Sequence, residues 1–229
     1  MLGSVVRAAV AVPQDHLDTL AKVANVLAHA SSGNKWHAIF KKALKDGLPA
    51  VTSKLLLNQI GTLTMSATTV KFIATEKFVV NTTNSARVKI SGFGDNFTKW
   101  FLADNGKIEE LTNEQVLCYA NLLKASVDGP IITELHGEEK AETSLSEMYS
   151  LMEKQGNGQN GVLLTSNHVV NLFYIRDAPE GVLRAVFVRW IVGGWRVVAF
   201  EVSDPHGWDD GSRVFSRNSA FKKYGTQKT

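Results

Sequence analysis

The chain has 229 residues, of which 44% are hydrophobic and 21% are charged. These fractions are typical of a folded globular protein, and they exclude the low hydrophobicity and high charge of a disordered chain. The formal net charge is +3, and the lysines and arginines are spread over several segments. A bias this small does not by itself indicate a protein that binds nucleic acid.

Cys118 is the only cysteine, so the chain can form no intrachain disulfide and no zinc cluster built from several thiolates. It lies among apolar residues in a run that resembles a helix, and we therefore expect a buried, unreactive thiol. A reducing compartment fits this cysteine usage best.

Residues 1–12 are apolar, but they contain Arg7 and are followed by Pro13. They lack the ordered charged, apolar and cleavage regions of a signal peptide. No other segment offers the run of about 18 apolar residues that a membrane span requires. We therefore expect a cytoplasmic protein with no membrane partner.

The N-terminal region predicts two consecutive helices. Asp15 can cap the first, whose apolar residues follow helical spacing until Gly33 ends it. Asn34 can cap the second, and Gly47 with Pro49 supplies its C-terminal stop. Together they indicate a helical hairpin.

The central region is mixed. β-branched and aromatic residues gather in short runs between turn residues, which predicts strands. The expected strands are Leu63 to Met65, Val70 to Ala74, Lys77 to Asn81 and Ala86 to Ile90.

Two capping boxes predict helices farther along the chain. Thr112 and Gln115 precede an apolar run that Gly129 and Pro130 would close. Ser144 and Glu147 precede a second run with one apolar face, whose methionines we expect to fill the core.

Gly156 to Gly161 is rich in glycine and asparagine, so we expect a surface linker there. The boundary would separate residues 1–155, a helical and mixed α/β region, from residues 162–229, a C-terminal meander with a basic tail. A single domain remains the alternative.

After this linker, the runs Asn171 to Arg176, Val182 to Trp190 and Trp195 to Ser203 are separated by short turns, which predicts an antiparallel meander. Successive side chains of a strand point to opposite faces, and in the second run both sets are largely apolar. The sheet that contains this run should therefore be covered on both sides. The nearby tryptophans are then mainly core, although a platform that stacks a ligand beside arginines stays open. The expected fold class is α+β: an N-terminal helical hairpin, a central mixed region and a C-terminal antiparallel β-meander packed by helices.

The loop after the meander gathers Asp204, His206, Asp209 and Asp210, a mixed imidazole and carboxylate set that suits zinc, manganese or iron. Its spacing matches neither an EF-hand nor a zinc protease helix. Asp-Pro, His-Gly and Asp-Gly are also turn dipeptides, so the loop has a purely structural alternative, which the residue pattern favours.

The basic tail that follows carries no acidic residue. We expect Arg213, Arg217, Lys222 and Lys223, together with Trp208, to be the binding residues.

A set of short segments carries a resemblance to known proteins: Glu76 to Val80, Arg87 to Ser91, Gly94 to Phe97, Ser126 to Ile132 and Arg213 to Asn218. Together these segments resemble a group of uncharacterised small bacterial proteins. The resemblance extends over roughly residues 70–220, and it implies no assigned activity.

Two functional hypotheses follow. The leading one is a non-enzymatic binding or interaction protein that contacts nucleic acid or a protein partner through its basic surface. The rival is a metal-dependent hydrolase that uses the Asp204–Asp210 loop. The sequence contains no nucleophile elbow and no phosphate-binding loop, so it specifies no catalytic residue or cofactor.

Overall fold

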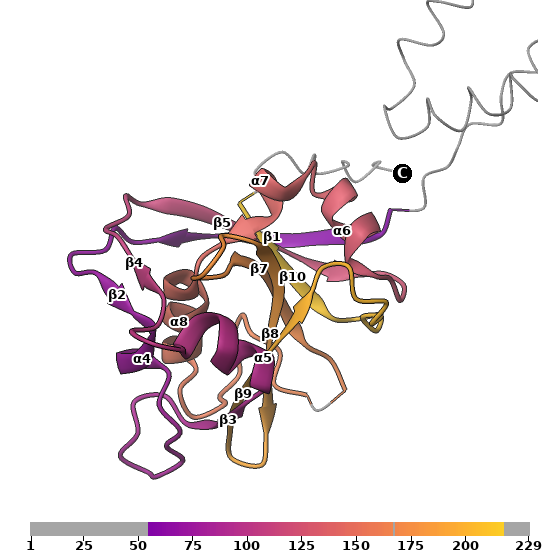
Figure 1. The fold of residues 1–229 in the computed structure, drawn as a ribbon. Helices are drawn as coiled ribbons and strands as arrows, with labels where there is room; N and C mark the ends of the chain where they lie inside the picture. Colours follow the sequence, from indigo (N-terminus) through magenta and orange to yellow (C-terminus); the bar gives the residue numbers. More distant parts are fainter. Residues whose placement is uncertain (1–54, 167, 218–229) are drawn as a thin grey trace, which may run out of the picture. The chain divides into compact units, whose positions relative to one another are not determined.

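The computed structural model describes residues 55–166 and 168–217. Within this part, eight strands form one mixed sheet in the order β1-β5-β10-β7-β8-β9-β3, with β6 paired to β7 (Figure 1). β2 and β4 form a separate two-stranded ladder. The strands are β1 (Leu57–Met65), β2 (Phe72–Ile73), β3 (Ile90–Phe93), β4 (Ile108–Glu109), β5 (Gln115–Leu122), β6 (Glu142–Thr143), β7 (Asn171–Arg176), β8 (Leu183–Ile191), β9 (Gly194–Glu201) and β10 (Arg213–Ser216).

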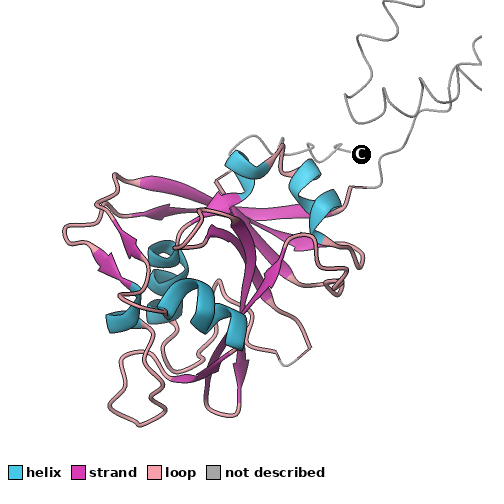
Figure 2. Cartoon of the chain, in the orientation of Figure 1, coloured by secondary structure: helices cyan, strands magenta, loops and turns pink. Residues whose placement is uncertain are grey.

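The helices are short and lie in separate groups against the sheet (Figure 2). They are α4 (Ala74–Lys77), α5 (Asp95–Phe97), η1 (Thr98–Leu102), α6 (Asp128–Glu134), α7 (Glu138–Ala141) and α8 (Leu145–Lys154). Apolar residues of α8, α5 and η1 belong to one hydrophobic core, and those of α6 belong to a second.

The two cores lie on opposite faces of the sheet. Along β8, Val186 and Val188 belong to the core with α8, whereas Ala185 and Phe187 belong to the core with α6. Successive side chains of a strand point to opposite faces, so β8 is covered on both sides. This confirms the alternation expected from the sequence.

The meander is also confirmed. β7 has the predicted bounds, and β7, β8 and β9 are antiparallel neighbours. The second capping box is present, because the Ser144 side chain accepts from the backbone N–H of Glu147 while the Glu147 side chain accepts from that of Ser144.

The predicted fold class is wrong. The described residues are dominated by the mixed sheet, and the meander is a part of it rather than a separate C-terminal unit. Parallel pairings of β10 and β6 with β7, and of β3 with β9, join strands from distant parts of the chain. Such pairings leave no local pattern in a sequence. The predicted N-terminal helical hairpin lies outside the described residues.

The helix expected after Thr112 is strand β5 instead. Leu117 packs into one core and Ala120 and Leu122 into the other, because β5 lies between β1 and β10 within the sheet. A strand buried on both faces reads as a continuous apolar run, which periodicity cannot tell from a buried helix. Cys118 is buried in this strand, and burial raises the pKa of its thiol.

The glycine-rich segment after α8 is anchored at its start. The carbonyl of Gly156 accepts from the backbone N–H of Lys89 at 2.8 Å. The Gln155 side chain donates to the carbonyls of Gln159 and Leu163 and accepts from the Leu163 N–H. β5, before this segment, and β7, after it, both pair with β10, so the two predicted regions share one sheet.

The turn between β8 and β9 holds a strained residue. Val192 and Gly193 are its two central residues, and both have positive φ, 34° and 82°. This geometry matches a type I′ turn, which favours Asn-Gly. A β-branched residue is disfavoured at positive φ, and Val192 is 99% exposed, so no packing offsets its strain.

We expect Val192→Asn to stabilise the protein by about 1 kcal/mol, because asparagine tolerates the left-handed region. Urea unfolding followed by tryptophan fluorescence measures the change. Val79→Asn is the control, since Val79 is also exposed but is not among the residues with positive φ. A Val192 variant no more stable than the parent would contradict the strain.

Candidate anion-binding groove

The predicted metal residues lie in an exposed turn. Oδ1 of Asp204 accepts from the backbone N–H of His206 at 2.9 Å, and Asp209 and Asp210 are exposed. The His206 ring stacks on Phe200, with centroids 4.7 Å apart. Across residues 55–166 and 168–217, no three His, Cys, Asp or Glu side chains form a group that could hold a metal. The loop therefore has the geometry of a turn, the structural alternative to a metal site.

Trp208 is 2% exposed and belongs to the core. Its Nε1 donates to Oδ1 of Asp128 at 2.7 Å, and the Tyr174 hydroxyl donates to the same oxygen at 2.7 Å. Asp128 is 1% exposed, and burial raises the pKa of its carboxyl to about 6, although the two hydrogen bonds oppose the shift. Burial, with Asp128 beside it, also holds the pKa of Tyr174 well above its usual value. No pattern in the sequence predicted that Asp128 and Tyr174 would form a buried polar group with Trp208.

The predicted binding arginines are engaged within the fold. The Arg213 Nε donates to Oδ1 of Asn121 at 3.1 Å, and its guanidinium lies over the Tyr119 ring. Arg217 donates from Nε and Nη2 to the Glu147 carboxylate at 3.2 and 3.0 Å. Lys222 and Lys223 lie outside the described residues.

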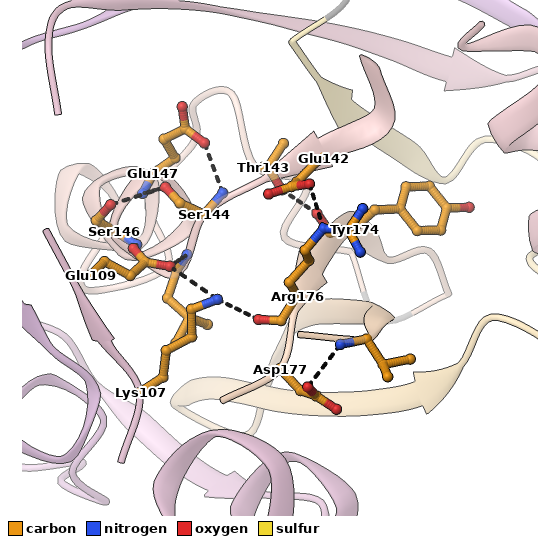
Figure 3. Close-up of polar contacts among 12 residues, drawn as sticks. Lys107, Glu109, Glu142, Thr143, Ser144, Ser146, Glu147, Tyr174, Arg176 and Asp177 are labelled. Atoms are coloured by element: carbon orange, nitrogen blue, oxygen red, sulfur yellow. Dashed lines mark hydrogen bonds and ion pairs between the residues drawn. The ribbon is translucent and has the colours of Figure 1, made fainter. Parts of the chain in front are cut away.

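A buried polar cluster fixes the start of α8 (Figure 3). The Glu109 carboxylate accepts from the backbone N–H groups of Leu145 and Ser146, both at 2.8 Å. The capping box satisfies the N–H groups of Ser144 and Glu147. The first turn of a helix leaves such donors without partners and carries partial positive charge, which the Glu109 carboxylate offsets.

Lys107 and Arg176 extend this cluster toward β7. Nζ of Lys107 donates to the carbonyl of Arg176 and lies 3.8 Å from the Glu109 carboxylate. Burial lowers the pKa of Lys107, and the nearby Glu109 opposes this shift. The Arg176 side chain pairs with Glu142 at 2.8 Å and Glu138 at 3.4 Å. The cluster therefore holds α8 and β7 in position and leaves these groups engaged with each other.

The anchored helix α8 forms one wall of an open groove of about 470 Å³. The opposite wall is the segment from Met65 to Phe72, and Lys77 of α4 and Arg87 also line it. Two hydrogen bonds between Thr68 and Thr112 hold this segment. The N–H of Thr68 donates to the carbonyl of Thr112 at 2.9 Å, and the N–H of Thr112 donates to the hydroxyl of Thr68 at 2.7 Å. The volume is within the usual range for ligand pockets.

The charged residues that line the groove are mainly cations. Lys71, Lys77, Arg87 and Lys154 face a single lining carboxylate, that of Glu153. Arg87 pairs with Glu153 at 2.7 Å, and Lys71 pairs with Glu110 at 2.7 Å. Lys77 and Lys154 have no ion-pair partner among the described residues. Within residues 55–166 and 168–217, two positive charges therefore stay uncompensated at this groove.

Tyr149 supplies a polar group to the same groove. Its ring packs edge-on against Phe72 and Phe78, with centroids 5.8 and 5.4 Å apart. Burial raises the pKa of its hydroxyl; Glu153 adds to the shift and Arg87 opposes it. The hydroxyl has no hydrogen-bond partner among the described residues, so it can donate to a ligand.

A second open hollow, of about 720 Å³, lies over the ends of β7, β8 and β9. Its arginines are compensated, because Arg184 pairs with Asp177 at 2.8 Å and with Glu201 at 3.7 Å. The guanidinium of Arg184 also lies 4.0 Å from the centre of the Trp100 ring. This hollow therefore offers no uncompensated charge from its arginines, and the groove beside α8 is the stronger candidate.

The sequence did not identify this groove as a site. Its cations come from the loop before β2, from α4, from the segment before β3 and from the end of α8. Residues this far apart in the chain form no motif. Only Lys77 and Arg87 fell within the short segments, and those carried a resemblance rather than a chemical argument.

The Asp128 carboxyl has a pKa above its unfolded value of 3.8, so the folded state binds its proton more tightly. Stability should then fall as pH rises from about 4 to about 6, by roughly 2 kcal/mol. Asp128→Asn keeps an oxygen that accepts from Tyr174 and Trp208 but cannot ionise. We expect the stability of this variant not to show that decrease. The measurement is the unfolding free energy in urea at each pH.

Asp209→Asn serves as the control, because Asp209 is exposed on the neighbouring loop. It should retain the parental decrease in stability. Identical pH profiles for the parent and Asp128→Asn would show that Asp128 does not carry this effect.

Comparisons with protein-family models, curated proteins and solved structures give no match for this chain. Within the described residues, no helix combines the length and apolar character needed to cross a membrane.

Proposed function

We propose that this protein is a non-enzymatic binding protein whose groove beside α8 holds the phosphate backbone of a single-stranded nucleic acid. The observation that carries the proposal is the pair of uncompensated cations, Lys77 and Lys154, at an open groove with one lining carboxylate. Such charges are retained at a cost in self-repulsion, which an anionic ligand relieves.

The arrangement suits a strand of phosphates better than one compact anion. The cations come from both walls and from separate elements, so they can contact successive charges of an extended chain. The Tyr149 hydroxyl can donate to a phosphate oxygen, and half of all protein contacts with nucleic acid, or more, are to the backbone. The ring of Tyr149 is engaged by Phe72 and Phe78, so base stacking has a minor part.

This mode of binding has recognisable properties. Contacts to phosphate carry no direct sequence information, so affinity should depend little on base sequence and strongly on salt. The rival interpretation, a metal-dependent hydrolase at Asp204–Asp210, has no supporting ligand geometry among the described residues.

The test is a fluorescence-anisotropy titration with a labelled single-stranded RNA over a range of salt concentrations. Lys77→Gln with Lys154→Gln should weaken binding and lower the salt slope by about 1.4, since each lost contact to a single strand removes about 0.7. Both side chains lie at the surface of the groove, so the double variant should remain folded.

The matched control is Lys99→Gln with Lys124→Gln, which removes the same charge from exposed positions away from the groove. It should keep the parental salt slope. Lys222→Gln with Lys223→Gln tests the basic tail in the same way. If the groove variant bound RNA as tightly as the parent, the groove would be rejected as the binding site. If only the tail variant lost RNA binding, the site would be assigned to the tail. Tighter groove-dependent binding of a poly-glutamate peptide than of RNA would reject nucleic acid as the partner.

A further inference from the structure

Two arginines face each other across the β8–β9 pair. The antiparallel register places Arg189 directly opposite Arg196. Residues directly opposite in an antiparallel pair have their side chains on the same face, about 5 Å apart at Cβ, and like charges there are destabilising. The fold therefore accepts a repulsive contact at this position.

The same two strands show how such a charge is normally compensated. Arg184 lies opposite Glu201, with an ion pair at 3.7 Å, and also pairs with Asp177. Arg189 and Arg196 are partly exposed, and no carboxylate of the described residues lies within ion-pairing distance of either. The contrast makes the arginine pair an exception within its own hairpin.

Arg189 also carries an unsatisfied donor. Its Nε is buried and has no hydrogen-bond partner in the described structure. A buried donor without a partner costs stability, and more so when the group is charged. A ligand that accepts from this Nε would recover that cost once a change in the Arg189 side-chain conformation brings the atom to the surface.

There is room for such a ligand beside Arg196. Gly92 of β3 is its partner on the other side of β9. Apart from Gly92 and its two chain neighbours, the only atom within 4 Å of a Cβ added at Gly92 would be Nη1 of Arg196, at 3.8 Å. On the side of Gly92, the space next to Nη1 of Arg196 is therefore open.

We propose that Arg189 and Arg196 form a binding site for a phosphate group. Two guanidinium groups on one face present several N–H donors in planar forks. These donors are better matched by the oxygens of a phosphate than by those of a single carboxylate. A doubly charged anion would also relieve the repulsion between the two arginines. The site lies on the β8–β9–β3 part of the sheet and shares no residue with the α8 groove, so it does not depend on the proposed function.

The first experiment measures the melting temperature of the full chain against inorganic phosphate, with sodium chloride matched for ionic strength. Phosphate should raise the melting temperature by mass action, and chloride should not. In Arg196→Gln this increase should be lost, with phosphate affinity at least about tenfold weaker. Without phosphate, Arg196→Gln should melt at or above the parental temperature, because the repulsion is gone.

A second measurement follows the Nε–H resonance of Arg189 by NMR. Phosphate should shift this resonance downfield as the hydrogen bond forms. Arg196→Lys keeps the charge but lacks the planar fork, so it should weaken phosphate binding and remain folded. The groove variant Lys77→Gln with Lys154→Gln should respond to phosphate like the parent. Methyl phosphate distinguishes the source: equal affinity assigns a phosphate ester, and preference for inorganic phosphate assigns the free ion.

Several results would overturn the site. If chloride raised the melting temperature as much as phosphate, the effect would be charge screening and not binding. If acetate raised it equally, the site would have no preference for phosphate. A phosphate response that persists in Arg196→Gln, or that disappears only in the groove variant, would place the ligand elsewhere. A lower melting temperature for Arg196→Gln, together with an unmoved Arg189 resonance in the parent, would make the pair purely structural.

Discussion

Burial of the sheet on both faces is the constraint on which the rest of this structure depends. β7 shows it most clearly, because its residues from Asn171 to Ile175 are all buried. It pairs with β8 on one side and with β10 and β6 on the other. A strand in this position has no contact with water on either face, so every polar group near it needs a partner inside the protein.

The buried polar groups satisfy this requirement in most places. The Asn171 side chain donates to the carbonyls of Leu164 and Val188 and accepts from the Leu164 N–H. Asp128 accepts from Tyr174 and Trp208, and Glu109 accepts from the first turn of α8. These contacts join the helices to the sheet, and the Glu109 contact sets the helix that forms one wall of the groove. Among the described residues, cations without an ion-pair partner occur at several surface positions, and those of the groove and of the β8–β9 hairpin stand out because they lie close to other cations.

Local patterns predicted the elements whose structure depends on neighbouring residues. The Ser144–Glu147 capping box predicted the start of α8 because both of its hydrogen bonds form within one turn. The β7, β8 and β9 meander was predictable because consecutive strands joined by short turns pair with each other. The prediction failed at residues 115–122, where burial on both faces removed the alternation that distinguishes a strand. It failed for the fold class because β10 inserts between β5 and β7, a pairing without local pattern.

The sequence by itself determined the apolar faces of β8, the capped helix α8 and the turns of the meander, since each follows from residues within one helical turn or one hairpin. Only the tertiary structure decided what the charged residues do. It placed Trp208 in the core and engaged Arg213 and Arg217 with neighbouring strands and helices. It also brought together the cations of the groove from four separate segments. The physical reason is that an ion pair depends on distance in space, and a sheet with parallel and crossing connections brings distant residues close while separating residues that are near in sequence.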